Sequence, residues 1–217
     1  MVEHVYNSAR RARLVDMTLV ATDDQRVADA VDAFGGTVVM TSPDHATGTD
    51  RLAEVAAALD ADLVVNVQGD EPLMTPEAID AAIQVLLDRP EDQMSTLRRE
   101  SRDEAEWRNH AVVKVVVDQA GYALYFTRSL VPFTRPGAPR PTVWKHMGLY
   151  VYRRAFLLKV AKLSPTPLER SEGLEQLRVL EHGFRISTAE TTVDTIGVDT
   201  PEDLDRVRKL VETGVRS

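Results

Sequence analysis

Apolar positions along the chain follow two periods, and these alternate. Stretches with one apolar face at helical spacing predict helices over residues 1–12, 24–34, 51–59 and 76–87. Short apolar or β-branched runs predict strands at 17–21, 37–40 and 63–67. Helices and strands that alternate at this spacing are typical of a parallel sheet built from right-handed crossovers. The first half therefore predicts an α/β fold.

The second half is richer in strand-like runs. Strands are predicted at 94–97, 112–117, 122–126, 147–152 and 184–188, and helices at 153–163, 172–182 and 201–211. Residues 118–121 (DQAG) predict a hairpin turn, and a loop rich in proline, arginine and glycine covers 132–141. We interpret residues 1–217 as one domain with a hairpin-containing subregion at about 111–152.

The run Leu63–Val67 and the polar residues after it predict a ligand site. The run lacks the alternation of a half-buried strand, which predicts burial on both faces of a parallel sheet. In such sheets, ligands bind outside the carboxyl ends of the strands. Gln68 and Gly69 follow the run directly, and the carboxylates of Asp70 and Glu71 could hold a hard cation.

A second aspartate, Asp199, follows residues 192–198, which we interpret as a further strand. Magnesium in proteins is usually held by one or two carboxylates, with water and substrate phosphates completing its shell. Asp70 and Asp199 at one edge of a sheet would supply that pair. The competing interpretation of Asp199 is helix capping, because the sequence VDTPED is by itself a strong helix start. The residues alone give these two interpretations similar weight.

Other polar residues are weaker candidates. Arg51 follows the polar loop HATGTD, and a cation near a helix start suits a bound anion, although a solvated arginine explains it equally well. His146 precedes a predicted strand, where a lone histidine is more often structural than catalytic. Glu175 and Gln176 lie in a predicted helix, where an exposed face is the simpler explanation.

Composition and absent motifs exclude several function classes. The formal net charge is −8 with no basic stripe, which argues against nucleic-acid binding. The chain has no cysteine, so it has no disulfide and no thiolate metal site, and this fits a reducing compartment. No apolar run approaches a membrane span and no secretory signal is evident, so we expect a cytoplasmic protein. Neither a GxGxxG nor a GxxxxGK[ST] motif occurs, nor a serine hydrolase elbow.

Taken together, seven segments resemble the 3-deoxy-manno-octulosonate cytidylyltransferase (CMP-Kdo synthetase) family. They are VATDD (20–24), DHATGTDRLAEV (44–55), VVNVQGDEP (64–72), AVVKVVVDQAGYALYFTRS (111–129), KHMGLYVYR (145–153), SPTPLERSEGLEQLRVL (164–180) and GVDTPEDLDRVR (197–208). They span almost the whole chain in the family's order. The resemblance implies a Rossmann-like nucleotide-diphospho-sugar transferase fold, with a mainly parallel sheet and helices on both faces.

The resemblance also implies a reaction and a site. The family transfers CMP from CTP to the sugar acid Kdo for lipopolysaccharide biosynthesis, releases pyrophosphate, uses Mg²⁺ and forms homodimers. The residues implied are Asp70 and Asp199 as catalytic metal ligands, Gln68 and Arg51 as nucleotide or sugar contacts, and His146, Tyr150, Glu175 and Gln176 in the sugar pocket.

The chain departs from the family pattern at its start. Family members begin with a buried strand and a triphosphate loop of the type PARxxSTRLPGK, whereas this sequence begins at Met1 in the helix that follows that loop. We therefore expect the first strand and the phosphate loop to be missing. Two alternatives to a CMP-Kdo synthetase stay open: a cytidylyltransferase for a related sugar acid, and a catalytically impaired chain that only binds ligand or a partner.

Overall fold

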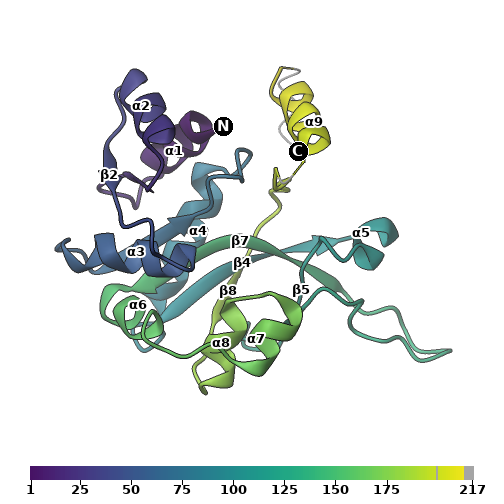
Figure 1. Ribbon diagram of the computed structural model, residues 1–217. Coiled ribbons are helices and arrows are strands. Elements are labelled where there is room, and N and C mark those ends of the chain that lie inside the picture. Colours follow the sequence, from purple (N-terminus) through teal and green to yellow (C-terminus); the bar gives the residue numbers. More distant parts are fainter. Residues whose placement is uncertain (199, 213–217) are drawn as a thin grey trace.

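Figure 1 shows the computed structural model, which describes residues 1–198 and 200–212. Its helices are α1 (Val2–Arg11), α2 (Gln25–Ala33), α3 (Gly48–Ala57), α4 (Pro76–Asp88), α5 (Glu104–Arg108), α6 (Arg154–Val160), α7 (Pro167–Glu172), α8 (Gln176–Glu181) and α9 (Pro201–Glu212). Its strands are β1 (Val20–Thr22), β2 (Val38–Met40), β3 (Leu63–Val67), β4 (Met94–Ser101), β5 (Lys114–Val117), β6 (Ala123–Thr127), β7 (Val143–Arg153) and β8 (Ser187–Glu190).

The strands form a small sheet and a large one, and the large sheet is mixed. The strands β1 and β2 pair in parallel, whereas the large sheet has the order β6-β5-β7-β4-β8 with β3 also beside β7. Within it β4 and β8 are parallel, and β7 runs antiparallel to β3, β4 and β5. The α/β class is confirmed, but the sheet is less parallel than the sequence predicted. The reason is β7, which comes from the distant second half and lies between β3 and β4.

Helices cover both faces of the large sheet, as expected (Figure 1). On one face, α1 and α4 pack against Leu97 of β4 and Met147 and Leu149 of β7. On the other face, α3, α6 and α8 pack with Phe126 of β6 and Tyr152 of β7. Alternate residues of β7 thus enter different cores, because successive side chains of a strand point to opposite faces.

The predicted strand Leu63–Val67 forms as β3, but it is less buried than predicted. Only Val64 of this strand is buried, and the others are half-buried. Among the residues that the structure describes, β7 is the one strand partner of β3. The carboxyl end of β3 still opens into the turn that carries Asp70, because the amide of Glu71 donates to the carbonyl oxygen of Gln68 at 3.2 Å.

The predicted helix over 172–182 is wrong at its start: α8 covers only Gln176–Glu181, and residue 172 ends a separate short helix, α7, that was not predicted. Helix α7 ends at Glu172 because Gly173 adopts φ +63°, a left-handed conformation that glycine accepts at little cost. Helix α8 then begins at Gln176 and places Glu175 at its first cap position. The break matters for the site below, because it places the exposed Glu175 at the cap of α8, ahead of the helix itself.

The hairpin of β5 and β6 forms at the predicted turn. Asp118 Oδ1 accepts hydrogen bonds from the amides of Ala120 (2.9 Å) and Tyr122 (2.8 Å). The loop over 129–142 then extends away from the body of the molecule (Figure 1). None of the described helices combines the length and the apolar character that a membrane crossing requires.

Candidate active site

A cavity of about 200 Å³ lies at the carboxyl end of β3. Four residues that the resemblance implied, Gln68, Tyr150, Glu175 and Gln176, line it together. They come from the end of β3, the centre of β7 and the start of α8. The other lining residues are Gly48, Thr49, Asn66, Tyr152, Val160, Gly173, Leu174, Arg178 and Val179. The structure thus brings together residues that are more than 100 positions apart in the sequence.

Glu175 is tied to the start of α3. The hydroxyl of Thr49 donates to Oε2 of Glu175 at 2.7 Å. Thr49 is buried, and it is carried into the cavity because Thr47 caps α3, its Oγ1 accepting from the amide of Asp50 at 3.2 Å. A carboxylate has about four acceptor positions, so Glu175 can still accept hydrogen bonds from a polyhydroxylated ligand.

A buried ion pair supports the wall formed by α7 and α8. Arg178 Nε and Nη2 donate to Glu169 Oε2 and Oε1 at 2.9 and 2.5 Å. Glu169 Oε2 also accepts from the amide of Thr166 at 3.0 Å, which closes the first turn of α7. Hydrogen bonds from the Arg178 guanidinium hold the pKa of the Glu169 carboxyl below its ordinary value despite burial. The pair is therefore charged and rigid.

His146 lies beside the cavity as a neutral ring. Its ring centroid is 5.5 Å from that of Tyr150, and burial lowers the pKa of His146 from 6.5 to about 3. The Thr96 hydroxyl donates to the carbonyl oxygen of Leu149 at 2.7 Å and lies 3.0 Å from His146 Nε2. Since that hydroxyl has one proton, Nε2 of His146 is the donor of the second contact, which leaves Nδ1 as an acceptor. His146 is thus not a cation here.

Asp70 is exposed in the turn after β3, and the chain leading to Asp199 lies next to it. The amide of Val198 donates to the carbonyl oxygen of Asp70 at 2.9 Å. Asp199 itself lies outside the described residues. Within the described part of the chain no cluster of three metal-ligating side chains occurs. Magnesium needs only one or two carboxylates, so an exposed Asp70 with an aspartate following Val198 fits it.

The start of α9 has a cap within the described part of the chain. Thr200 takes the cap position: its Oγ1 accepts from the amide of Asp203 at 3.2 Å, and Asp203 Oδ2 accepts from the amide of Thr200 at 3.1 Å. This reciprocal arrangement is a capping box with aspartate at its third helical position. Thr200 and Asp203 therefore supply a cap for α9, and the role of Asp199 stays a prediction.

Arg51 is placed away from the residues that line the cavity. Its Nη1 donates to Thr41 Oγ1 at 2.5 Å and its Nη2 pairs with Asp23 at 3.1 Å. These partners follow β2 and β1, so Arg51 closes the edge of the small sheet. Helix α3 begins at Gly48, so the prediction that Arg51 opens it was wrong by one turn.

The sequence interpretation overlooked several lining residues. Asn66 is a polar residue inside a strand run, and Thr49 belongs to the polar loop GTD, so the sequence pattern could have indicated both. No sequence pattern could have indicated Tyr152 and Arg178, because an aromatic residue in a strand and an arginine in a helix are ordinary. Burial of both side chains shows only in the tertiary structure.

The same fold occurs in known nucleotidyltransferases. A solved structure of CMP:2-keto-3-deoxy-manno-octonic acid synthetase complexed with CTP matches with a TM-score of 0.93 and 41% identity, covering 99% of this chain and 88% of that one. A putative glucose-1-phosphate thymidylyltransferase from Bacillus anthracis, 16% identical, matches with a TM-score of 0.64 over 96% of this chain and 81% of that one, which indicates a shared fold alone.

Curated relatives identify the family. A family model described as cytidylyltransferase matches residues 1–187. The 3-deoxy-manno-octulosonate cytidylyltransferase of Geobacter metallireducens is 54% identical over 95% of this chain and 85% of its own length. The protein of that name from Solibacter usitatus is 50% identical over 99% of this chain and 85% of its own length. The chain therefore belongs to the 3-deoxy-manno-octulosonate cytidylyltransferase family.

Proposed function

We propose that this chain transfers CMP from CTP to Kdo and releases pyrophosphate. The observation that carries the proposal is the match to a CTP-complexed synthetase at a TM-score of 0.93 and 41% identity. The convergence of Gln68, Tyr150, Glu175 and Gln176 on one cavity supports it from the residues upward. A product of this kind serves lipopolysaccharide biosynthesis.

The cavity has the chemistry to hold a polyhydroxylated sugar acid. Glu175 accepts hydroxyl protons, and the amides of Gln68 and Gln176 both donate and accept. His146 does not line the cavity but packs near Tyr150, and being neutral it adds no charge there. The side chains that line the cavity orient the sugar so that its anomeric oxygen attacks the α-phosphorus of CTP while the bond to the β-phosphate oxygen breaks. The hydroxyl proton is lost as the new P–O bond forms, and pyrophosphate leaves.

We propose Asp70 and Asp199 as the ligands of the magnesium ion that this reaction uses. When bound, magnesium neutralises charge on the phosphates and so favours attack by an oxygen nucleophile. Two observations support this assignment. Asp70 is exposed at the end of β3, and the amide of Val198 donates a hydrogen bond to the carbonyl oxygen of Asp70. Arg51, held by Asp23 and Thr41, remains our candidate for a nucleotide or sugar contact.

A coupled assay for pyrophosphate tests the proposal. With CTP, Mg²⁺ and Kdo we expect turnover that stops when EDTA is added. Replacing Kdo with an amino-Kdo or a sialic acid separates the proposed substrate from a related sugar acid. Binding of Kdo without pyrophosphate release under any of these conditions would overturn the proposal in favour of a chain that only binds ligand.

We further propose a cytoplasmic homodimer that uses the subregion at about 111–152. Apolar side chains are exposed there: Phe133 is 86% exposed, Leu124 59% and Leu130 43%. Burying them against a second copy would remove apolar area from water. Light scattering tests this idea: we expect the mass of two chains, and the mass of one chain for the double variant Leu130→Ser, Phe133→Ser. A monomeric parent protein would contradict it.

A further inference from the structure

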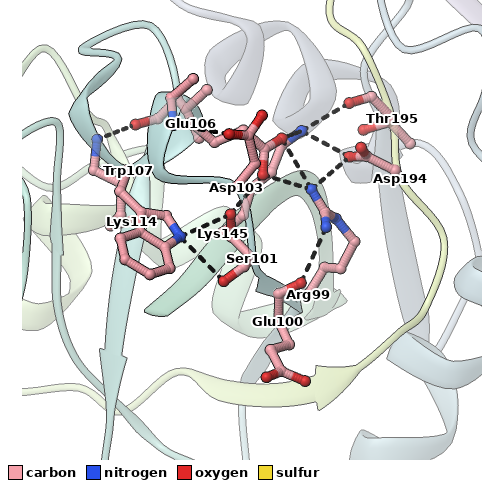
Figure 2. Close-up of polar contacts among 12 residues, drawn as sticks. Arg99, Glu100, Ser101, Asp103, Glu106, Trp107, Lys114, Lys145, Asp194 and Thr195 are labelled. Carbon is pink, nitrogen blue, oxygen red and sulfur yellow. Dashed lines mark hydrogen bonds and ion pairs between the residues drawn. The ribbon is translucent and has the colours of Figure 1, made fainter. Parts of the chain in front are cut away.

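A network of charged residues anchors the segment 194–198, which precedes the proposed metal ligand Asp199. Lys145 Nζ lies 2.8 Å from Asp194 Oδ1 and 3.0 Å from the carbonyl oxygen of Thr195 (Figure 2). The same ammonium lies 3.3 Å from Glu106 Oε1. Lys145 belongs to β7, the strand that pairs with three others in the large sheet. The segment is thereby fastened to the centre of the sheet.

A second cation completes the charge balance of this network. Arg99 of β4 pairs with Glu106 at 2.8 Å and with Asp194 at 3.1 Å (Figure 2). The side chains of Arg99, Lys145 and Glu106 are only 16%, 14% and 19% exposed. Two cations thus face two carboxylates, of which Asp194 is 33% exposed, and removing a partner is most costly for the three more buried members.

Glu71 holds the same segment from the other side. Burial raises the pKa of its carboxyl, and the Thr195 side chain partly offsets that rise. Its Oε1 lies close to Gly148 of β7, where an added Cβ would come within 3.2 Å, and an added Cβ at Gly197 would come within 4.0 Å. Among the described residues, its buried Oε2 has no hydrogen-bond partner. A carboxyl in this position fills the space between β7 and the segment.

We propose that Lys145 and Glu71 are positioning residues for the magnesium-dependent reaction: they fix the segment 194–198 against the turn that carries the proposed metal ligand Asp70. The inference rests on the proposed function. It follows from continuity, because Val198 is hydrogen-bonded to Asp70, and Asp194 and Thr195 are hydrogen-bonded to Lys145. Residues that orient metal ligands typically change metal affinity about 10–100-fold when they are replaced.

The first test replaces Lys145 with methionine and follows Mn²⁺ binding by electron paramagnetic resonance in the presence of CTP. We expect Mn²⁺ affinity to fall about 10-fold or more, because the segment loses its anchor. Hydrogen exchange at the amide of Val198 should become faster in the same variant. Lys145→Arg keeps a cation that can reach Asp194, and it should restore most of the Mn²⁺ affinity.

The matched control is Lys114→Met. Lys114 is the cross-strand partner of Lys145, and its ammonium donates to carbonyl oxygens of Asn109, Val112 and Arg128 and not to the segment. Its loss should lower thermal stability without weakening Mn²⁺ binding by the folded protein. Equal Mn²⁺ affinities for the parent and Lys145→Met, with an unchanged Val198 exchange rate, would overturn the proposal.

A second route is available if Lys145→Met does not fold. Gly148→Ala adds a methyl group 3.2 Å from Glu71 Oε1 and should push that carboxyl toward the segment. We expect weaker Mn²⁺ binding and faster Val198 exchange, and unchanged values would again contradict the proposal. Asp70→Asn separates this inference from the proposed function. If Asp70→Asn does not change Mn²⁺ binding, the metal assignment fails. If Asp70→Asn weakens Mn²⁺ binding but Lys145→Met and Gly148→Ala do not, only the positioning role is refuted.

Discussion

The hydroxyl of Thr49 donates a hydrogen bond to Glu175 over 2.7 Å and so joins two residues 126 positions apart in the sequence. Thr49 stands at the start of α3 and Glu175 at the cap of α8, and both line the cavity. The bond fixes one oxygen of a carboxylate that we expect to receive a sugar hydroxyl. We therefore expect Thr49 to orient the Glu175 carboxylate for sugar binding and to have no direct role at the reacting phosphorus.

Thr49→Val should raise the KM for Kdo with a smaller effect on kcat. Valine keeps the volume of threonine but removes the donor to the exposed Glu175, and losing one such hydrogen bond costs about 0.5–1.5 kcal/mol, or roughly 2–12-fold in affinity. Steady-state kinetics with Kdo as the varied substrate measures this change. Thr49→Ser keeps the hydroxyl and serves as the control. An unchanged KM for Thr49→Val would show that Glu175 needs no donor from α3.

Asp199→Asn and Asp70→Asn should each abolish magnesium-dependent turnover and leave the fold intact. Asparagine keeps the shape of aspartate but removes the negative charge that a hard cation requires. Pyrophosphate release at several Mg²⁺ concentrations, with circular dichroism as the folding check, measures the effect. If Asp199→Asn remains active and only its helix content falls, Asp199 is a helix cap after all.

Local patterns sufficed for elements whose cause is local. The strand Leu63–Val67, the helix that begins at Pro76 and the hairpin turn at 118–121 all form near their predicted bounds. Each depends on apolar periodicity, a capping threonine or a turn that residues within a few positions determine. The break at Gly173 is also local, but the prediction started a helix at 172 and ran it through that glycine.

Properties that depend on distant residues could not be predicted in the same way. The direction of β7 against β3 comes from a strand pair 80 or more positions apart, and no local pattern records it. The placement of Arg51 depends on Asp23 and Thr41, whose proximity arises only when β1 and β2 pair. The resemblance to a known family supplied the residues of the cavity, whereas their chemistry, such as the neutral state of His146, required burial to be known.

Arg178→Met should destabilise the protein by about 3 kcal/mol or more. The side chains of Arg178 and Glu169 are 6% and 10% exposed, and removing one partner of a buried pair leaves the other charge uncompensated. Urea unfolding measures the free energy. Arg208→Met is the matched control, because Arg208 and Asp205 are 63% and 68% exposed, and such pairs contribute about 0–1 kcal/mol. Equal losses in the two variants would contradict a charged, buried pair.

His146 should make the protein less stable as the pH falls below its ordinary pKa. Burial lowers the pKa of His146 from 6.5 to about 3, so the folded protein holds the neutral ring while the unfolded chain takes up a proton. A depressed folded pKa contributes stability that is complete above about pH 6.5 and is lost as the pH falls toward 3. Between pH 7 and pH 5 this contribution falls by about 2 kcal/mol, since one pKa unit corresponds to about 1.4 kcal/mol.

The variant His146→Gln isolates this contribution from those of other titrating groups. Glutamine retains an Nε2 donor for Thr96 but does not titrate. Burial raises the pKa of Glu71, which acts with the opposite sign as the pH falls, so a single stability curve cannot assign the effect. When the pH is lowered from 7 to 5, we therefore expect the free energy of unfolding of the parent to fall by about 2 kcal/mol more than that of His146→Gln. Parallel curves would mean that His146 keeps its ordinary pKa and is solvated in the folded protein.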